Sequence, residues 1–92
     1  MNEWKVKVMQ EQTRRLKEVG FTVDWGRAEE EPSAVVVKRV EPESYTSVTA
    51  PAIGKDACEA LLSAVKTLVH FKELDPDVLV RWCPGCRKIH KE

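Results

Sequence analysis

The sequence has little cysteine, no net charge and no long hydrophobic run, and each shortage excludes a class of protein. It has three cysteines in 92 residues, and an odd number without a secretory signal does not indicate a disulfide framework. Its 15 basic residues are balanced by 15 acidic ones, which argues against a protein that wraps nucleic acid by neutralising phosphates. No apolar stretch approaches the roughly 20 residues of a membrane span, so we expect no membrane association.

The remaining composition is that of one folded domain. The chain is 42% apolar and 33% charged, which is too apolar and too balanced in charge for a disordered chain. We expect residues 1–92 to form a single domain, with an α+β core over residues 1–74 and a C-terminal strand with a cysteine hook over residues 75–92. The first residues lack the apolar segment of a secretory signal, and cysteines that are not paired indicate a reducing, cytoplasmic location.

Two segments have the periodicity of amphipathic helices. Residues 55–72 place their apolar side chains over an arc of about 200° on a helical wheel. Residues 2–19 gather Trp4, Val8 and Leu16 within an arc of about 140°, and Gly20 supplies a C-terminal stop. Residues 3–8 also alternate between apolar and polar, so a strand at that position is the alternative.

The segments between these helices have the alternation and the β-branched content of strands. We expect strands near residues 21–25, 34–40 and 45–49, and a last strand over residues 78–82. The predicted fold is α+β, with a three- to four-stranded antiparallel sheet, two helices on one face and a zinc-knuckle-like hook at the C-terminus. If residues 3–8 were a strand, the fold would be ferredoxin-like, βαββαβ.

The strongest chemical signal is the pattern formed by Cys83, Cys86 and His90. A tight turn, which Gly85 permits, directs two cysteines three residues apart to one ion, and the histidine lies close enough to add a third ligand. The stretch WCPGC resembles the first half of a zinc knuckle, in which a strand leads into a CPxC turn. This resemblance covers about nine residues, and Arg87 stands where the common knuckle pattern has glycine. It implies a structural zinc ion as cofactor.

A structural zinc site usually has four protein ligands, so a fourth donor has to come from elsewhere. The candidates are Cys58 and His70, the latter on the polar face of the second helix. An oxygen ligand could instead come from Asp75, Asp77 or Glu92, or a ligand could come from a second chain. Cys58 lies within the apolar arc of the same helix, where a lone cysteine is usually a small core residue. We therefore interpret Cys58 as structural.

These features favour a small non-catalytic, zinc-stabilised module that binds a protein partner or serves a regulatory role. The chain contains no phosphate-binding loop, and with two histidines it has no candidate Ser-His-Asp arrangement. We therefore expect no enzyme activity. The identity of the protein partner is not encoded in any recognisable motif.

The wide apolar arc of the second helix also favours a homodimer. A helix that lies on one sheet needs a narrower apolar face, so apolar surface should remain along Leu62, Val65 and Val69. Exposed apolar patches usually mark a contact. The alternative is that the C-terminal strand and hook fold back over this patch within one chain.

A nucleic-acid-binding module is the alternative function. The order helix, three strands, helix is the topology of double-stranded RNA-binding domains, but residues 54–59 contain one lysine and two acids, where those domains need lysines. The C-terminal hook is basic, and an aromatic ring within it could stack on a base. The candidate contacts are Arg81, Trp82, Arg87, Lys88 and Lys91.

Overall fold

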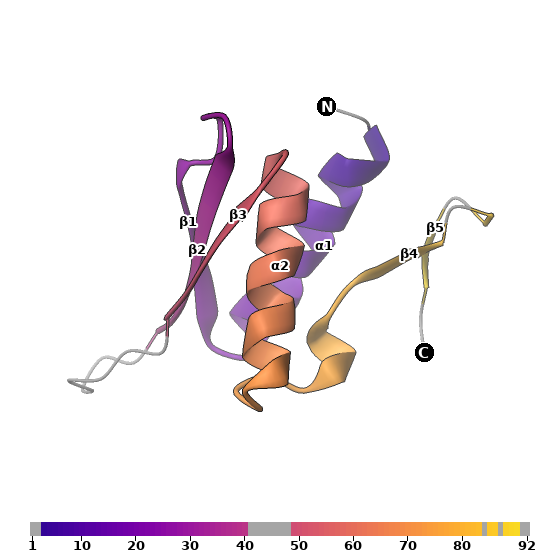
Figure 1. Ribbon diagram of the computed structural model, residues 1–92. Coiled ribbons are helices and arrows are strands. Elements are labelled where there is room, and N and C mark those ends of the chain that lie inside the picture. The colour runs from indigo at the N-terminus through magenta and orange to yellow at the C-terminus, as the bar shows by residue number, and fades with distance from the viewer. Residues whose placement is uncertain (1–2, 41–48, 84, 87, 91–92) are drawn as a thin grey trace.

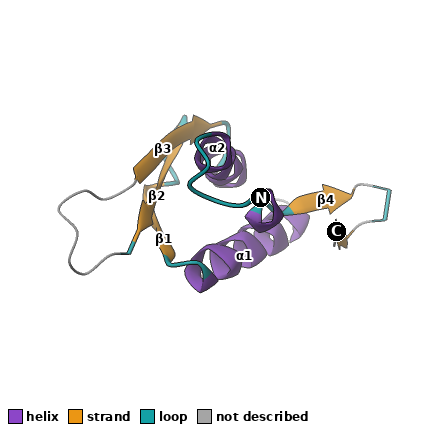
Figure 2. Cartoon of the chain, turned by 90° about the horizontal axis from the view of Figure 1, so that it is seen from below, coloured by secondary structure: helices purple, strands orange, loops and turns teal. Residues whose placement is uncertain are grey.

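Two helices and two small sheets make up the fold in the computed structural model, which describes residues 3–40, 49–83, 85–86 and 88–90. The elements follow in the order α1 (Glu3–Glu18), β1 (Phe21–Arg27), β2 (Ser33–Arg39), β3 (Thr49–Gly54), α2 (Ala57–His70), the 3-10 turn η1 (Pro76–Val78), β4 (Arg81–Cys83) and β5 (Lys88–His90). Both helices lie on the same face of the larger sheet (Figure 2). The predicted α+β class is confirmed, and the helical conformation of residues 3–8 excludes the ferredoxin-like alternative. Among the described residues, neither helix is long and apolar enough to cross a membrane.

The larger sheet is antiparallel, with the strand order β1-β2-β3. Alternate residues of β2, such as Val35 and Val37, are buried against the helices. The predicted third strand ends too early: residues 45–48 lie outside the described residues, and β3 continues from Thr49 through Pro51 to Gly54. Proline is tolerated here because β3 is an edge strand with a neighbour on one side only.

Local signals set the ends of the helices. Gly20 follows α1 with φ +84°, a left-handed conformation that glycine adopts without steric cost. The side chain of Asp56 caps α2 by accepting a hydrogen bond of 2.8 Å from the backbone N–H of Glu59. A Cβ on Gly54 would lie 2.6 Å from the backbone nitrogen of Ala60, so β3 passes too close to α2 for any larger residue.

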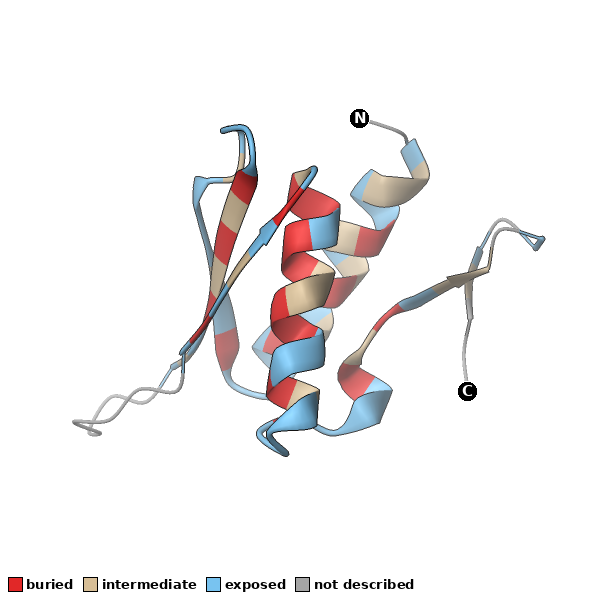
Figure 3. Cartoon of the chain, in the orientation of Figure 1, coloured by how far each residue is buried: buried red, intermediate tan, exposed pale blue. Residues whose placement is uncertain are grey.

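The main core lies between the helices and the sheet, where the facing surfaces are buried (Figure 3). It includes Leu16, Phe21, Val37 and Leu61. Val65 belongs to this core and is 0% exposed, so the prediction that it lies on a free apolar strip is wrong. Val69 is half-buried against the same core.

A second, smaller cluster lies where α1, α2 and the C-terminal segment meet. Val8, Cys58 and Val80 are buried in it, and Leu62, Trp82 and Ile89 pack against them. The C-terminal segment therefore folds back over Leu62. This is the arrangement that the sequence predicted as the alternative to an exposed dimer surface. The arc of α2 is wide because it serves two cores rather than one.

Candidate metal centre

The cysteine pair lies on the cysteine hairpin, which we define as β4, β5 and the residues that connect them. Trp82 pairs with Ile89 and Cys83 pairs with Lys88. Because successive residues of a strand point to opposite faces, Trp82 and Ile89 share the face that packs on the second cluster. Cys83 and Lys88 belong to the opposite face. The hairpin projects from the side of the helices that faces away from the larger sheet (Figures 1 and 2).

The last strand is shorter than predicted and has a different partner. Residues 76–78 form η1, and β4 begins only at Arg81. It pairs with β5 in a two-stranded sheet of its own, so it does not extend the larger sheet. The second strand, β5, was not predicted, because three residues after a turn carry too little periodicity to be recognised.

Cys83 and Cys86 are brought together. A hydrogen bond with Cys83, and next the charge of Cys83, raise the pKa of the Cys86 thiol above its ordinary value. Cys86 is exposed and Cys83 is half-buried, and neither forms a disulfide. Two adjacent sulfurs, one of them exposed to solvent, can supply two of the ligands of a thiolate metal site.

The other predicted ligands are placed differently. The backbone of His90 pairs with Arg81, and its side chain lies outside what the structure describes. His70 is exposed at the end of α2, about 18 Å along the helix axis from Cys58. It is not brought together with the cysteine pair. Within the described residues, no three His, Cys, Asp or Glu side chains lie close enough together to hold an ion.

Cys58 is buried beneath the hairpin, on its Trp82 side. Burial, and next the charge of Asp56, raise the pKa of the Cys58 thiol. A protonated thiol is a poor metal ligand, because it is the thiolate that binds. The structural role predicted for Cys58 agrees with its 3% exposure.

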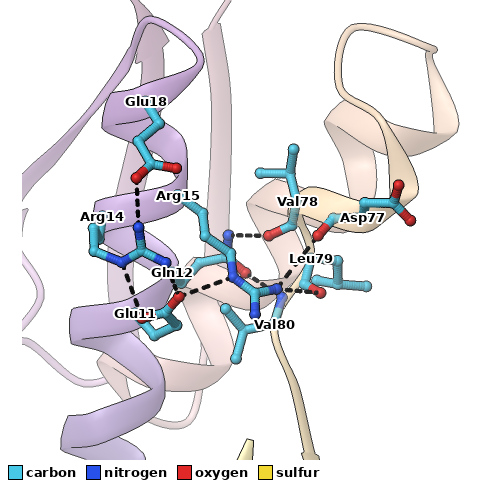
Figure 4. A network of polar contacts seen from close by, with 9 residues as sticks. All are labelled: Glu11, Gln12, Arg14, Arg15, Glu18, Asp77, Val78, Leu79 and Val80. Atoms are coloured by element: carbon cyan, nitrogen blue, oxygen red, sulfur yellow. Dashed lines mark hydrogen bonds and ion pairs between the residues drawn. The ribbon is translucent and has the colours of Figure 1, made fainter. Parts of the chain in front are cut away.

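Gln12 holds the base of the hairpin on α1 (Figure 4). Its side chain is fully buried; Nε2 donates to the carbonyl of Val78 at 2.9 Å, and Oε1 accepts from the N–H of Val80 at 2.8 Å. Both polar groups of the amide are therefore satisfied by one strip of backbone. Sequence reasoning missed this residue, although a glutamine between Val8 and Leu16 on an apolar helix face was the available signal.

Two further contacts from α1 fix the hairpin. The Arg15 guanidinium donates to the carbonyl of Asp77 at 3.3 Å and to that of Leu79 at 3.4 Å (Figure 4). Trp4 stacks on Trp82 with ring centroids 5.3 Å apart and an angle of 19° between the planes. The cysteine pair is thus carried by a hairpin that is anchored at its base and along one face.

Only two of the four basic residues of the C-terminal hook lie within the described residues. Arg81 and Lys88 are exposed, whereas Arg87 and Lys91 lie outside the described residues. Trp82, the predicted stacking residue for a base, is half-buried and already stacked on Trp4. One face of its ring is therefore occupied within the chain.

A separate groove lies on the other side of α1, between that helix, the β1–β2 hairpin and the start of α2. We call it the Trp25 groove; it encloses about 830 Å³. Trp25 and Val6 are each 38% exposed along it. It is lined by Val6, Met9, Gln10, Thr13, Trp25, Gly26, Ala28, Glu29, Glu30 and Ala57.

Comparison with known proteins identifies no family: no family model, no curated protein and no solved structure matches this chain significantly.

Proposed function

We propose that this protein is a non-catalytic binding module whose cysteine hairpin carries a structural zinc ion. The observation that carries the proposal is the contact between the Cys83 and Cys86 thiols on a hairpin anchored to α1. Thiolates are soft ligands that favour zinc among the common divalent ions. The proposal also requires a reducing compartment such as the cytoplasm, where the thiols remain available.

The metal would stabilise an element that is weak by itself. An isolated two-stranded hairpin is marginally stable in water, and β4 and β5 contain three residues each. A metal bound by both cysteines closes the end of the hairpin opposite the Gln12 contacts. The hairpin would then be held at its base by hydrogen bonds and at its tip by coordination.

Elemental analysis of protein purified without chelator tests this proposal. We expect zinc to copurify with wild-type protein and to be lost in the Cys83→Ser and Cys86→Ser variants. Cys58→Ala is the matched control, because it removes the remaining cysteine, and it should retain the metal. Wild-type protein without metal, whose Cys83 and Cys86 titrate freely in the native state, would overturn the proposal.

The Trp25 groove is the proposed surface for a protein partner. Tryptophan is enriched among residues that contribute most to binding energy, and here Trp25 lies next to apolar side chains of α1. Glu29 and Glu30 add negative charge to the groove. A partner that presents apolar side chains flanked by lysine or arginine would complement it.

A capture experiment with paired variants tests this surface. Proteins bound by the wild type should be lost with Trp25→Ala. They should be retained with Ile53→Ala, which removes another exposed apolar side chain (67% exposed) from the outer face of the sheet. Equal capture by both variants would contradict the assignment of the groove.

Nucleic-acid binding through the hook is the second candidate, and the exposure of Arg81 and Lys88 favours it. The stack between Trp4 and Trp82 weighs against base stacking. Binding to a single-stranded oligonucleotide with a steep salt dependence, lost in Arg81→Ala, would favour this function over a protein partner.

A further inference from the structure

Within the residues that the structure describes, the cysteine pair of a single chain is an incomplete metal site. A structural zinc ion takes four protein ligands, and Cys83 and Cys86 supply two. Across the residues that the structure describes, no third metal-ligating side chain joins them. Cys58 lies under the Trp82 face of the hairpin, which is opposite to the face of Cys83.

The position of the pair leaves room for ligands from outside the chain. The hairpin projects from the helices on the side away from the larger sheet (Figures 1 and 2). Gly85 and Cys86 are exposed at its tip. Two such tips can meet about a two-fold axis while the bodies of the chains stay apart. That contact is isologous, which is the commonest form of protein self-association.

Charge favours a second copy of the same hairpin. One Zn²⁺ with four thiolates carries a net charge of two minus, and residues 81–91 contain four basic residues and no acid. Arg81 and Lys88 are exposed, and Lys88 pairs with Cys83 across the hairpin. Two hairpins would surround the anionic centre with cations. Without the metal, the same cations would repel each other, so association should depend on zinc.

We propose that a second copy of this chain completes the site, so that Cys83 and Cys86 of both chains bind one zinc ion. Each of the four thiols releases its proton to solvent on binding, and the metal joins the chains as a homodimer. This inference rests on the proposed zinc site. It replaces the apolar strip of α2, which the chain itself covers, as the basis for a homodimer.

Mass and metal stoichiometry measured together test the inference. By native mass spectrometry and light scattering with zinc present, we expect twice the 10.5 kDa chain mass and one zinc per two chains. Excess chelator should return the protein to a monomer. Cobalt in place of zinc should give the spectrum of tetrahedral coordination by four thiolates.

Variants separate this inference from the proposed function. Cys83→Ser and Cys86→Ser should abolish both zinc binding and dimer, and Cys58→Ala should preserve both; far-UV circular dichroism checks that each variant is folded. A monomer with one zinc per chain, or a cobalt spectrum showing nitrogen or water ligands, overturns the shared site and leaves the zinc module standing. A dimer that survives chelation also overturns it, whereas absence of zinc overturns both proposals.

Discussion

The polar side chains that interrupt the apolar face of α1 are the ones that connect this helix to the rest of the chain. Lys5 pairs with the cap residue of α2, and Gln12 and Arg15 bind the backbone around η1. Gln12 is fully buried, and a buried polar group without a partner is costly, so its two hydrogen bonds restrict where the rest of the chain can pack. The polar residues on the apolar face of α1 therefore determine which other segments this helix contacts.

Gln12→Met should destabilise the protein by about 2–4 kcal/mol, because the side chain keeps its approximate size but leaves a buried carbonyl and a buried N–H unsatisfied. Urea unfolding followed by circular dichroism measures the free energy of unfolding. Gln10→Met is the matched control, since Gln10 is exposed on the same helix and its substitution should have little effect. Equal effects of the two substitutions would show that the Gln12 bonds contribute nothing.

Gly54→Ala should cost about 1–3 kcal/mol, because the new Cβ would collide with the backbone of α2. The atom it meets is the Ala60 nitrogen at 2.6 Å, which cannot move without shifting the helix. Gly26→Ala is the comparison: its Cβ would meet only a carboxylate oxygen of Asp24 at 3.1 Å. Thermal or urea unfolding should therefore show a larger loss for Gly54→Ala than for Gly26→Ala.

At the scale of elements, α2 begins at the point where three segments meet. Asp56 follows β3, caps α2 through the N–H of Glu59 and pairs with Lys5 of α1. The hydrogen bond from Lys5, and next the one from Glu59, lower the pKa of Asp56. A single carboxylate thus fixes the start of one helix and its position beside the other.

The charge of Asp56 should make stability depend on pH in the acid range. The folded pKa lies below its ordinary value of 3.8, so the contribution is fully present above about pH 4 and is lost as pH falls through the folded pKa. Asp56→Asn keeps a capping oxygen and removes this titration. The difference in unfolding free energy between wild type and variant, measured in urea, should be constant from about pH 7 to pH 5 and shrink below about pH 4. A difference that grows on acidification would contradict this assignment.

At the scale of the whole molecule, the two helices separate a large hydrophobic core from a smaller one. The main core joins α1, α2 and the larger sheet and contains none of the hairpin residues. The cysteine hairpin rests on the second cluster, on the opposite side of the helices. A metal bound at the cysteine pair, as proposed, would therefore be remote from the packing that maintains the body.

Removal of the proposed metal should loosen the hairpin and leave the body folded. With excess chelator, the far-UV circular dichroism and the main urea transition should be unchanged, because no residue of the main core would bind the metal. Hydrogen exchange at the amides of residues 81–83 and 88–90 should accelerate, since an undocked hairpin is marginally stable. Loss of the helical signal on chelation would instead identify a metal-dependent fold.

The sequence by itself determined the features whose causes are local. Helical periodicity placed α1 and α2 within two residues of their observed ends, and alternation found β1 and β2. The sequence predicted a strand that leads into a turn between Cys83 and Cys86, and in the structure β4 ends at Cys83 while Cys86 lies in a turn. Such patterns act over one or two helical turns or one strand, so they can be recognised without knowing the rest of the chain.

Only the tertiary structure decided the features that depend on distant residues. Gln12 meets Val78 across 66 positions of sequence, and no local pattern indicates that pairing. The extent of β3 depends on β2, and the burial of Val65 depends on both helices and the sheet. The separation of His70 from the cysteine pair likewise follows from which end of α2 the hairpin docks against. Long-range packing selects one arrangement among many that local propensity permits, and that selection separated His70 from the cysteine pair.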